Sequence, residues 1–229
     1  MSNPDLALLR LLQLFSPTAP TGAFSYSQGL EWAVECGWIS NVADTHDWLS
    51  SQLAHHLQSL ELPILLRLYQ ATEANDPDTF LYWSQILYAS RETDELRQEE
   101  KHRSQALWLM LDKLPESTAW IELKQWKPAL DSSQLASFAL AANKWQISAS
   151  SLLLAYCWSW LENSVAAAIK LIPLGQSQGQ QLLHQLSPQI SDSCQQAAKI
   201  ADHQISSSTT AIAIASSLHE TQYSRLFRS

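Results

Sequence analysis

One long apolar stretch constrains the fold of this chain more than any other feature. Between Ala149 and Ile172 the only charged residues are Glu162 and Lys170, and the stretch contains no proline or glycine. As a single helix it would be roughly 36 Å long, because an α-helix rises about 1.5 Å per residue. A helix that is apolar on nearly every face is buried either inside a protein or in a membrane.

The membrane interpretation is the weaker of the two. A spanning helix needs about 20 consecutive apolar residues with few or no charges, whereas Glu162, Asn163 and several serines interrupt this stretch. The sequence therefore predicts a central core helix over about residues 149–172, in a protein that does not bind a membrane.

The scarcity of glycine favours helices in the rest of the chain as well. Only 5 of the 229 residues are glycine, about 2% against a usual 7% or so, and all-β proteins use glycine in their tight turns. The length would suit one large domain or two small ones. No linker, internal repeat or boundary stands out, so we expect one all-α domain over residues 1–229, built as a bundle of about ten helices.

Charge and cysteine usage limit the partners and the compartment. The formal net charge of −8 disfavours nucleic acid or anionic lipid as the main partner. Cys36, Cys157 and Cys194 are odd in number and widely separated, which predicts free, buried thiols in a reducing compartment. No basic segment precedes the N-terminal apolar run, so no signal peptide is predicted and we expect a cytoplasmic protein.

Prolines and capping residues divide the rest of the chain into further helices. Asp5 can cap the first helix, Gly37 can end the second in a left-handed conformation, and Pro63 suits the first turn of another. Residues 118–128 alternate in polarity, so a short strand is an alternative there. The predicted helices span residues 5–14, 23–36, 41 or 44 to 60, 63–74, 78–91, 92–111, a helix capped by Asp131 that ends at 146, and two or three helices between 176 and 217.

Signatures of catalysis are absent from the sequence. The glycine pairs Gly22–Gly29 and Gly175–Gly179 have the wrong spacing for a phosphate-binding loop and lack its lysine. The segment Ser25–Gly29 superficially resembles a nucleophile elbow, but the first glycine of that motif is missing and no strand is predicted before it. We therefore predict that the chain is not an enzyme and has no catalytic residue and no cofactor.

Metal-binding patterns are equally weak. The adjacent histidines 55–56 would point about 100° apart on a helix, and no HxxxH or CxxC pattern occurs. Glu99 and His102, with Glu95 one turn earlier, resemble half of a di-metal carboxylate helix pair, but the second half is missing. We expect a solvated charged face with pairs such as Glu99–Arg103 at helical spacing, and no metal site.

The C-terminal tail, about residues 218–229, ends in aromatic, leucine and arginine side chains. Such residues are typical anchors for a partner surface, and a tail folded back on its own domain is the alternative. If the tail serves a partner, deletion of residues 222–229 should lower the free energy of unfolding by no more than about 1 kcal/mol, as for a surface change. A larger loss would indicate that the tail packs on its own domain.

Four segments together resemble the UreF family of urease accessory proteins. They are LLQLFSPTAPTGAFSYSQGLE, SRETDELR, SWLENSVAAAIKLIPLGQSQGQ and HETQYSRLFRS, and they follow the family's order over nearly the whole chain. The resemblance implies an all-α, cytosolic protein that is not an enzyme and forms homodimers. It also implies a place in the assembly that delivers nickel to apo-urease, together with UreD (called UreH in some organisms) and the GTPase UreG.

The resemblance assigns candidate partner-binding residues by position. The family's KxxPLGQ patch, expected to face the GTPase, matches Lys170, Pro173, Gly175 and Gln176. Its N-terminal motif, expected at the same cleft, matches Phe24, Tyr26 and Glu31. The segment expected to meet UreD matches His219, Glu220, Tyr223, Ser224, Arg225, Leu226, Phe227 and Arg228.

Three departures from the family pattern are visible. Ala19 and Thr21 stand where bulkier apolar residues are expected, and Gln28 stands where histidine is frequent. The run from Asp94 to Lys101 is also more acidic than expected. These departures concern the cleft contacts.

Two functional hypotheses follow from this resemblance. The first is a non-catalytic scaffold that joins UreD and UreG, and through them apo-urease. The alternative is a regulator that activates the GTPase by inserting Arg225 or Arg228 of the tail as an arginine finger. Acceleration of GTP hydrolysis on mixing, lost in an arginine-to-lysine variant, would favour the second hypothesis.

Overall fold

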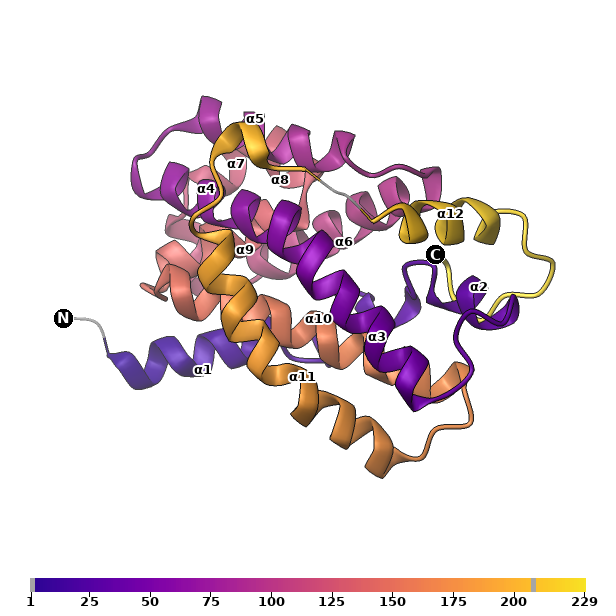
Figure 1. The fold of residues 1–229 in the computed structure, drawn as a ribbon. Helices are drawn as coiled ribbons and strands as arrows, with labels where there is room; N and C mark the ends of the chain where they lie inside the picture. The colour runs from indigo at the N-terminus through magenta and orange to yellow at the C-terminus, as the bar shows by residue number, and fades with distance from the viewer. Residues whose placement is uncertain (1–2, 207–208) are drawn as a thin grey trace.

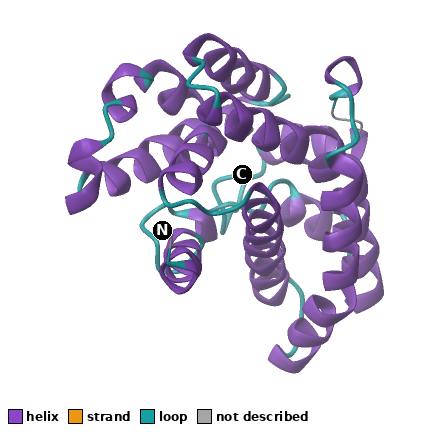
Figure 2. Cartoon of the chain, turned by 90° about the vertical axis from the view of Figure 1, so that its left-hand side faces the viewer, coloured by secondary structure: helices purple, strands orange, loops and turns teal. Residues whose placement is uncertain are grey.

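The computed structural model describes residues 3–206 and 209–229, and every regular element in this part of the chain is helical (Figures 1 and 2). The predicted all-α class is confirmed. Where a strand was an alternative, the chain forms the 3-10 helix Pro115–Ala119, α7 (Glu122–Gln125) and α8 (Lys127–Ser132). The other α-helices are α1 (Pro4–Leu14), α2 (Leu30–Glu35), α3 (Val42–Gln52), α4 (Leu62–Glu73), α5 (Pro77–Ala89), α6 (Asp94–Asp112), α9 (Gln134–Lys144), α10 (Ala149–Leu171), α11 (Gln176–Ala197) and α12 (Thr210–His219).

The long apolar stretch forms α10, which lies at the centre of the molecule. Its N-terminus is capped by the Ser148 side chain, which accepts the N–H of Ser151 at 3.2 Å. The helix packs against α1, α2, α3, α4, α9 and α11. By length and composition α10 could cross a membrane, but these neighbours make it a core helix. Burial is less complete than predicted, because Leu154 and Trp158 are each 42% exposed.

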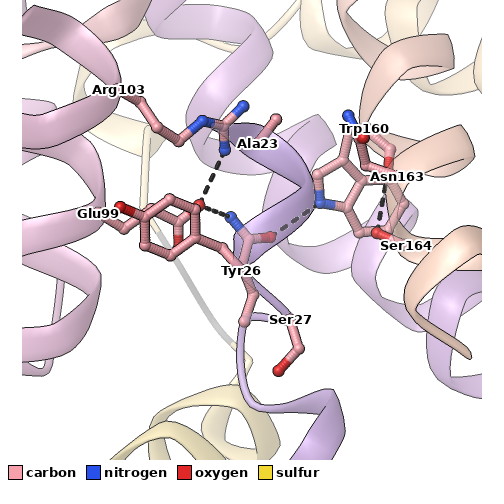
Figure 3. A pocket seen from close by; sticks show the side chains of 9 residues that line it. Ala23, Tyr26, Ser27, Glu99, Arg103, Trp160, Asn163 and Ser164 are labelled. Carbon is pink, nitrogen blue, oxygen red and sulfur yellow. Dashed lines mark hydrogen bonds and ion pairs between the residues drawn. The ribbon is translucent and has the colours of Figure 1, made fainter. Parts of the chain in front are cut away.

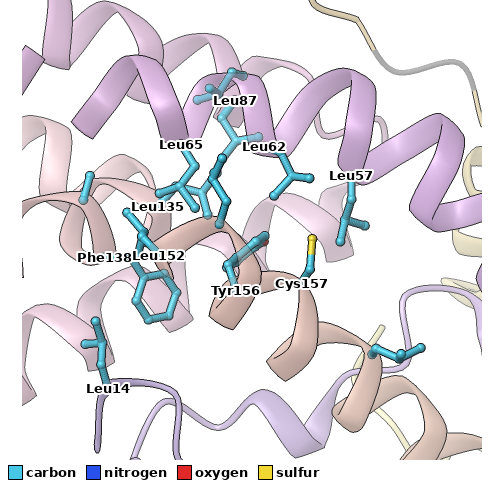
Figure 4. Packing of buried hydrophobic residues seen from close by; sticks show 14 of the residues in the cluster. Leu14, Leu57, Leu62, Leu65, Leu87, Leu135, Phe138, Leu152, Tyr156 and Cys157 are labelled. Atoms are coloured by element: carbon cyan, nitrogen blue, oxygen red, sulfur yellow. The ribbon is translucent and has the colours of Figure 1, made fainter. Parts of the chain in front are cut away.

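The centre of the core is made by leucine and aromatic side chains from α4, α9 and α10 (Figure 4). Leu62 and Leu65 of α4, Leu135 of α9 and Leu152 of α10 are completely buried. Each buried leucine contributes about 1.5–3 kcal/mol relative to an exposed one. The apolar face of α10 is therefore a main source of stability.

Residues 42–73 form one continuous rod, where the sequence predicted two helices. The rod consists of α3, the π-helix Leu53–Glu61 and α4. A break was expected before Pro63, because proline has no N–H and its ring crowds the carbonyl four residues earlier. The π-helix bonds to the fifth residue back, as Leu62 N does to Leu57 O. Its wider turn gives the proline ring room.

The predicted helix over residues 23–36 is interrupted. Gln28 and Gly29 have φ values of 54° and 82°, and a right-handed helix cannot pass through two left-handed residues. The segment therefore forms a short 3-10 helix, Ala23–Ser25, followed by α2. Gly37, at φ 79°, lies directly after α2 in the predicted left-handed conformation.

Several local predictions were wrong. Asn3 rather than Asp5 caps α1. Asp131 lies inside α8, where it pairs with Lys127 at 2.5 Å, and Ser133 caps α9. Cys157 and Cys194 are buried free thiols as predicted, but Cys36 is exposed.

The close approach of α10 and α11 depends on one glycine. A Cβ atom at Gly179 would lie 2.5 Å from Ile169 Cδ1, so a larger residue would force the Ile169 side chain to move. Farther along α11, Pro188 cannot donate to the carbonyl of His184. The hydroxyl of Ser187 donates to that carbonyl at 2.9 Å and replaces the missing bond.

Candidate partner-binding site

The C-terminal tail lies against the domain (Figure 1). The backbone N–H groups of Ser27 and Gln28 donate to the main-chain oxygen of Ser229 at 2.7 and 3.1 Å. The N–H of Arg228 donates to the carbonyl of Ser25 at 2.9 Å. Of the two sequence-based alternatives for the tail, the folded-back arrangement is the one observed.

The side chains of the tail divide between the interior and the solvent. Phe227 is buried, and the Lys170 Nζ atom lies 5.6 Å from the centre of its ring, in a cation–π contact. Tyr223 is fully exposed and Leu226 is 64% exposed. The folded-back tail therefore still exposes apolar side chains to solvent.

Glu31 holds the tail through its backbone. Its Oε1 accepts the N–H of Leu226 at 2.6 Å, and its Oε2 accepts the N–H of Phe227 at 2.9 Å. Glu31 lies in the first turn of α2, whose preceding residue Gly29 packs against α12. A Cβ atom at Gly29 would lie 3.0 Å from the Cβ of Ala215. The glycine thus allows α2 and α12 to approach closely.

His219 joins the same site from the end of α12. It is completely buried, with Nδ1 2.6 Å from Glu95 Oε2 and Nε2 3.2 Å from Glu31 Oε2. Arg225 also pairs with Glu95. Glu220 Oε1 accepts the first two backbone N–H groups of α6, at 2.9 and 3.3 Å, so α12 and the tail are fixed to α6.

Two glutamates of the acidic run in α6 point into the protein, which corrects the predicted solvated face, whereas Asp94 at the start of the run is exposed. Glu99 is 3% exposed and Glu100 is 1% exposed. Each carboxylate meets a cation: Glu99 pairs with Arg103 at 2.8 Å, as the helical spacing predicted, and Glu100 pairs with Arg91 at 2.6 Å. Glu95 meets the ring of His219. Buried carboxylates need such partners, and most of these come from outside α6.

A small cavity lies beside Glu99, between α6, α10 and the loop before α2 (Figure 3). The Gln28 side chain crosses it: Trp160 Nε1 donates to Gln28 Oε1 at 3.0 Å, and Gln28 Nε2 donates to Glu99 Oε1 at 3.0 Å. The volume of about 20 Å³ is enough for one water molecule. The cavity is lined by Ala23, Tyr26, Ser27, Gln28, Glu99, Arg103, Trp160, Asn163 and Ser164.

The remaining candidate residues lie around this site. Lys170 is exposed at the end of α10, and its contact with Phe227 joins the KxxPLGQ segment to the tail. Phe24 is exposed, whereas Tyr26 is buried at the cavity. The turn between α10 and α11 presents Pro173, Gly175 and Gln176 to solvent.

Sequence reasoning missed that three residues outside the tail hold it: Ser27, Glu95 and Glu99. The excess of acid between residues 94 and 101 was a visible signal. It was assigned to solvent, because local patterns do not show that His219 and Arg225, which lie 124 and 130 residues away, meet Glu95.

A second charged cluster belongs to the core. Arg91 Nη2 lies 2.6 Å from both Glu61 Oε1 and Glu100 Oε2, and the Tyr156 hydroxyl donates to Glu61 Oε2 at 2.6 Å. Burial opposes ionisation of Glu61, but the Arg91 charge and hydrogen bonds from His56 and Tyr156 hold its pKa well below the usual range. Within residues 3–206 and 209–229, no group of three or more His, Cys, Asp or Glu side chains could hold a metal ion.

Comparison with known sequences identifies the family. The UreF family profile matches residues 39–187. The chain is 54% identical to the urease accessory protein UreF of Alcanivorax borkumensis, over 97% of this chain and 98% of that protein. It is 46% identical to UreF of Alkalilimnicola ehrlichii (100% and 98% covered) and 44% identical to UreF of an Escherichia coli strain (100% of both). The chain therefore belongs to the UreF family of urease accessory proteins.

Proposed function

We propose that this chain is a non-catalytic docking platform for urease maturation in the cytoplasm. It joins UreD, called UreH in some organisms, to the GTPase UreG, so that nickel is inserted into apo-urease. Neither a resident cofactor nor a stable nickel site is part of this proposal. The observation that carries it is the tail: its backbone is held by hydrogen bonds to the domain, while Tyr223 and Leu226 of the tail face solvent.

The surface for UreD consists of exposed apolar side chains on α12 and the tail. Ile214 and Leu218 of α12 are 43% and 42% exposed, and Tyr223 and Leu226 of the tail are more exposed still. Exposed aromatic side chains such as Tyr223 are frequent anchors of protein interfaces, and a tail whose backbone is already held loses little conformational entropy on binding.

The surface for UreG includes Lys170 and the turn that follows α10. Lys170 is exposed. It lies in the last turn of α10, where a positive charge interacts favourably with the helix dipole. An ammonium group there suits an acidic side chain of the GTPase. Its contact with Phe227 places this surface next to the tail.

Homodimer formation is supported by an apolar face outside the tail. Leu8, Leu9 and Leu12 of α1 are more than half exposed. Beside them, α1 and α10 enclose a groove of about 540 Å³ whose lining includes Leu154 and Trp158. A ridge and a groove on the same face are self-complementary, as a two-fold interface requires.

The arginine-finger alternative has one feature in its favour. Arg225 pairs with Glu95, whereas Arg228 is exposed. Arg228→Lys keeps the charge and removes the fork of donors. If the alternative holds, UreG hydrolyses GTP faster with the wild-type protein and not with this variant.

The central test is co-purification with UreD and UreG, with molecular mass measured by light scattering for the free protein and the complex. For the free protein we expect the mass of two chains. For the purified complex we expect this protein together with UreD and UreG. Lys170→Ala should weaken UreG capture and leave the helix content unchanged. Absence of both partners from the purified complex would overturn the proposal.

A further inference from the structure

Glu99 connects three segments that are far apart in the sequence. Its Oε1 accepts the side-chain N–H of Gln28 at 3.0 Å and the Nη1 of Arg103 at 2.8 Å, and its Oε2 accepts the hydroxyl of Ser229 at 2.8 Å. The side chain is almost fully buried. A buried carboxylate needs all of its hydrogen bonds, so it favours one arrangement of these segments.

Glu99 acts on the tail by a direct and an indirect route. The direct route is the Ser229 hydroxyl. The indirect route runs through Gln28, whose backbone N–H donates to the main-chain oxygen of Ser229 at 3.1 Å. The amide of Gln28 is fixed at both ends, by Trp160 and by Glu99, and a flipped amide would place oxygen against the carboxylate.

The backbone of Gln28 depends on this support. Its φ of 54° is unfavourable for a residue with a side chain, and such a conformation persists only where its surroundings enforce it. Gly29 follows in the same left-handed region at no steric cost. Loss of the Glu99 contact would therefore release the loop that receives the end of the tail.

We propose that Glu99 is a positioning residue for the partner surface. It holds the loop at Gln28 and the end of the tail in one conformation, so that Tyr223 and Leu226 are presented together. The consequence for partner binding rests on the proposed function, whereas the positioning is a property of the free protein.

Glu99→Gln tests this role, because it keeps the shape of the side chain and removes its charge. Hydrogen-exchange mass spectrometry of the free protein should show about tenfold faster exchange or more at residues 25–30 and 222–229, as expected for loss of one charge-assisted hydrogen bond. The amides of α10 should keep their rates. Glu92→Gln, at an exposed glutamate just before α6, is the matched control and should change neither. Unchanged exchange at the tail of a folded Glu99→Gln protein overturns the inference.

A second variant covers loss of folding. Glu99→Gln leaves Arg103 without the charge it pairs with, and an unpaired buried charge can unfold a protein. If circular dichroism shows that the single variant has lost its helices, the double variant Glu99→Gln/Arg103→Gln is measured in its place. The same faster exchange at the tail is expected, and unchanged exchange again overturns the inference.

Capture of UreD by the same variants separates the two proposals. Faster exchange together with weaker capture supports both the positioning role and the docking function of the tail. Faster exchange with unchanged capture supports the positioning role and contradicts the proposed function of the tail. Unchanged exchange contradicts the positioning role, whatever the capture.

Discussion

Glu31 shows how one side chain can order a chain terminus. It accepts two consecutive backbone N–H groups of the tail and faces a ring nitrogen of His219. Hydrogen bonds to a carboxylate are shorter and stronger than those to a neutral acceptor. The family resemblance marked Glu31 as a partner-binding residue, and in the structure it contacts the protein's own tail.

Glu31→Gln should lower the free energy of unfolding by about 2 kcal/mol. In either orientation the amide NH₂ would face the backbone N–H of Leu226 or Phe227, which leaves a buried donor unsatisfied. Guanidinium chloride unfolding, followed by circular dichroism, measures the change. Glu35→Gln, at an exposed position of the same helix, is the matched control and should stay within about 0.5 kcal/mol of wild type. Equal midpoints for both variants would contradict the role assigned to Glu31.

Glu61 should make stability depend on pH in the acid range. Its pKa is held well below the usual value in the folded protein, so the unfolded chain binds more protons below about pH 4.5. The stabilisation is therefore complete above that pH and is lost on acidification. We expect urea midpoints to fall as the pH is lowered from about 6 to about 3. Glu61→Gln should be less stable at pH 6, and its urea midpoint should depend less steeply on pH than that of the wild type. Equal pH dependence in the two proteins would contradict this account.

At the scale of elements, the sequence was a good guide to the extent of long helices. The apolar stretch predicted over 149–172 is observed as Ala149–Leu171, because an N-cap serine begins it and nothing interrupts it. The helix over 23–36 could not be predicted correctly, since no residue type demands the left-handed conformation of Gln28. That conformation is supported by side-chain contacts from distant segments, which local patterns do not contain.

The orientation of helices was harder to predict than their extent. The charged helix predicted over 92–111 corresponds to α6, but its side chains Glu95, Glu99 and Glu100 meet protein partners. Periodicity shows which residues share a face, and it does not show what covers that face. The run from Asp94 to Lys101 is more acidic than the family pattern, and this was the one available hint. It was interpreted as a feature of the solvated surface.

The packing of α10 on α11 should be sensitive to Gly179. A Cβ atom there would meet Ile169 Cδ1 at 2.5 Å and Val165 Cγ1 at 3.3 Å, so Gly179→Ala should destabilise the protein by about 1–3 kcal/mol through overpacking. Gly175→Ala is the control, because the nearest atom to its Cβ would be Gln178 Oε1 at 3.7 Å. Thermal unfolding compares the two. A Gly179→Ala protein as stable as the control would mean that the Ile169 side chain moves aside at little cost.

At the scale of the whole molecule, segments that the sequence presented separately meet in one place. The N-terminal motif, the KxxPLGQ segment and the tail are in contact through Glu31 and through the pair Lys170–Phe227. The resemblance implied that the first two share a cleft. The ordered tail could not be derived, because its bonds run between backbone groups and carboxylates about 200 residues apart, as between Leu226 and Glu31.

Deletion of residues 222–229 should now lower the free energy of unfolding by about 2–4 kcal/mol. The change removes the buried ring of Phe227 and takes partners from Glu31 and Glu99. This exceeds the loss of about 1 kcal/mol expected for a free, partner-binding tail. Denaturant unfolding of the truncated and full-length chains measures the difference in free energy of unfolding. A loss below about 1 kcal/mol would mean that the tail contacts contribute little to stability.

The cation–π contact between Lys170 and Phe227 has a consequence for how two bound partners would affect one another. If UreD binds the tail and UreG binds Lys170, each partner contacts one member of this pair. Binding of one partner would then change the affinity for the other. Thermodynamic reciprocity then requires that the factor by which UreD changes the affinity for UreG equals the factor by which UreG changes the affinity for UreD. The two proteins would communicate across a single pair of side chains.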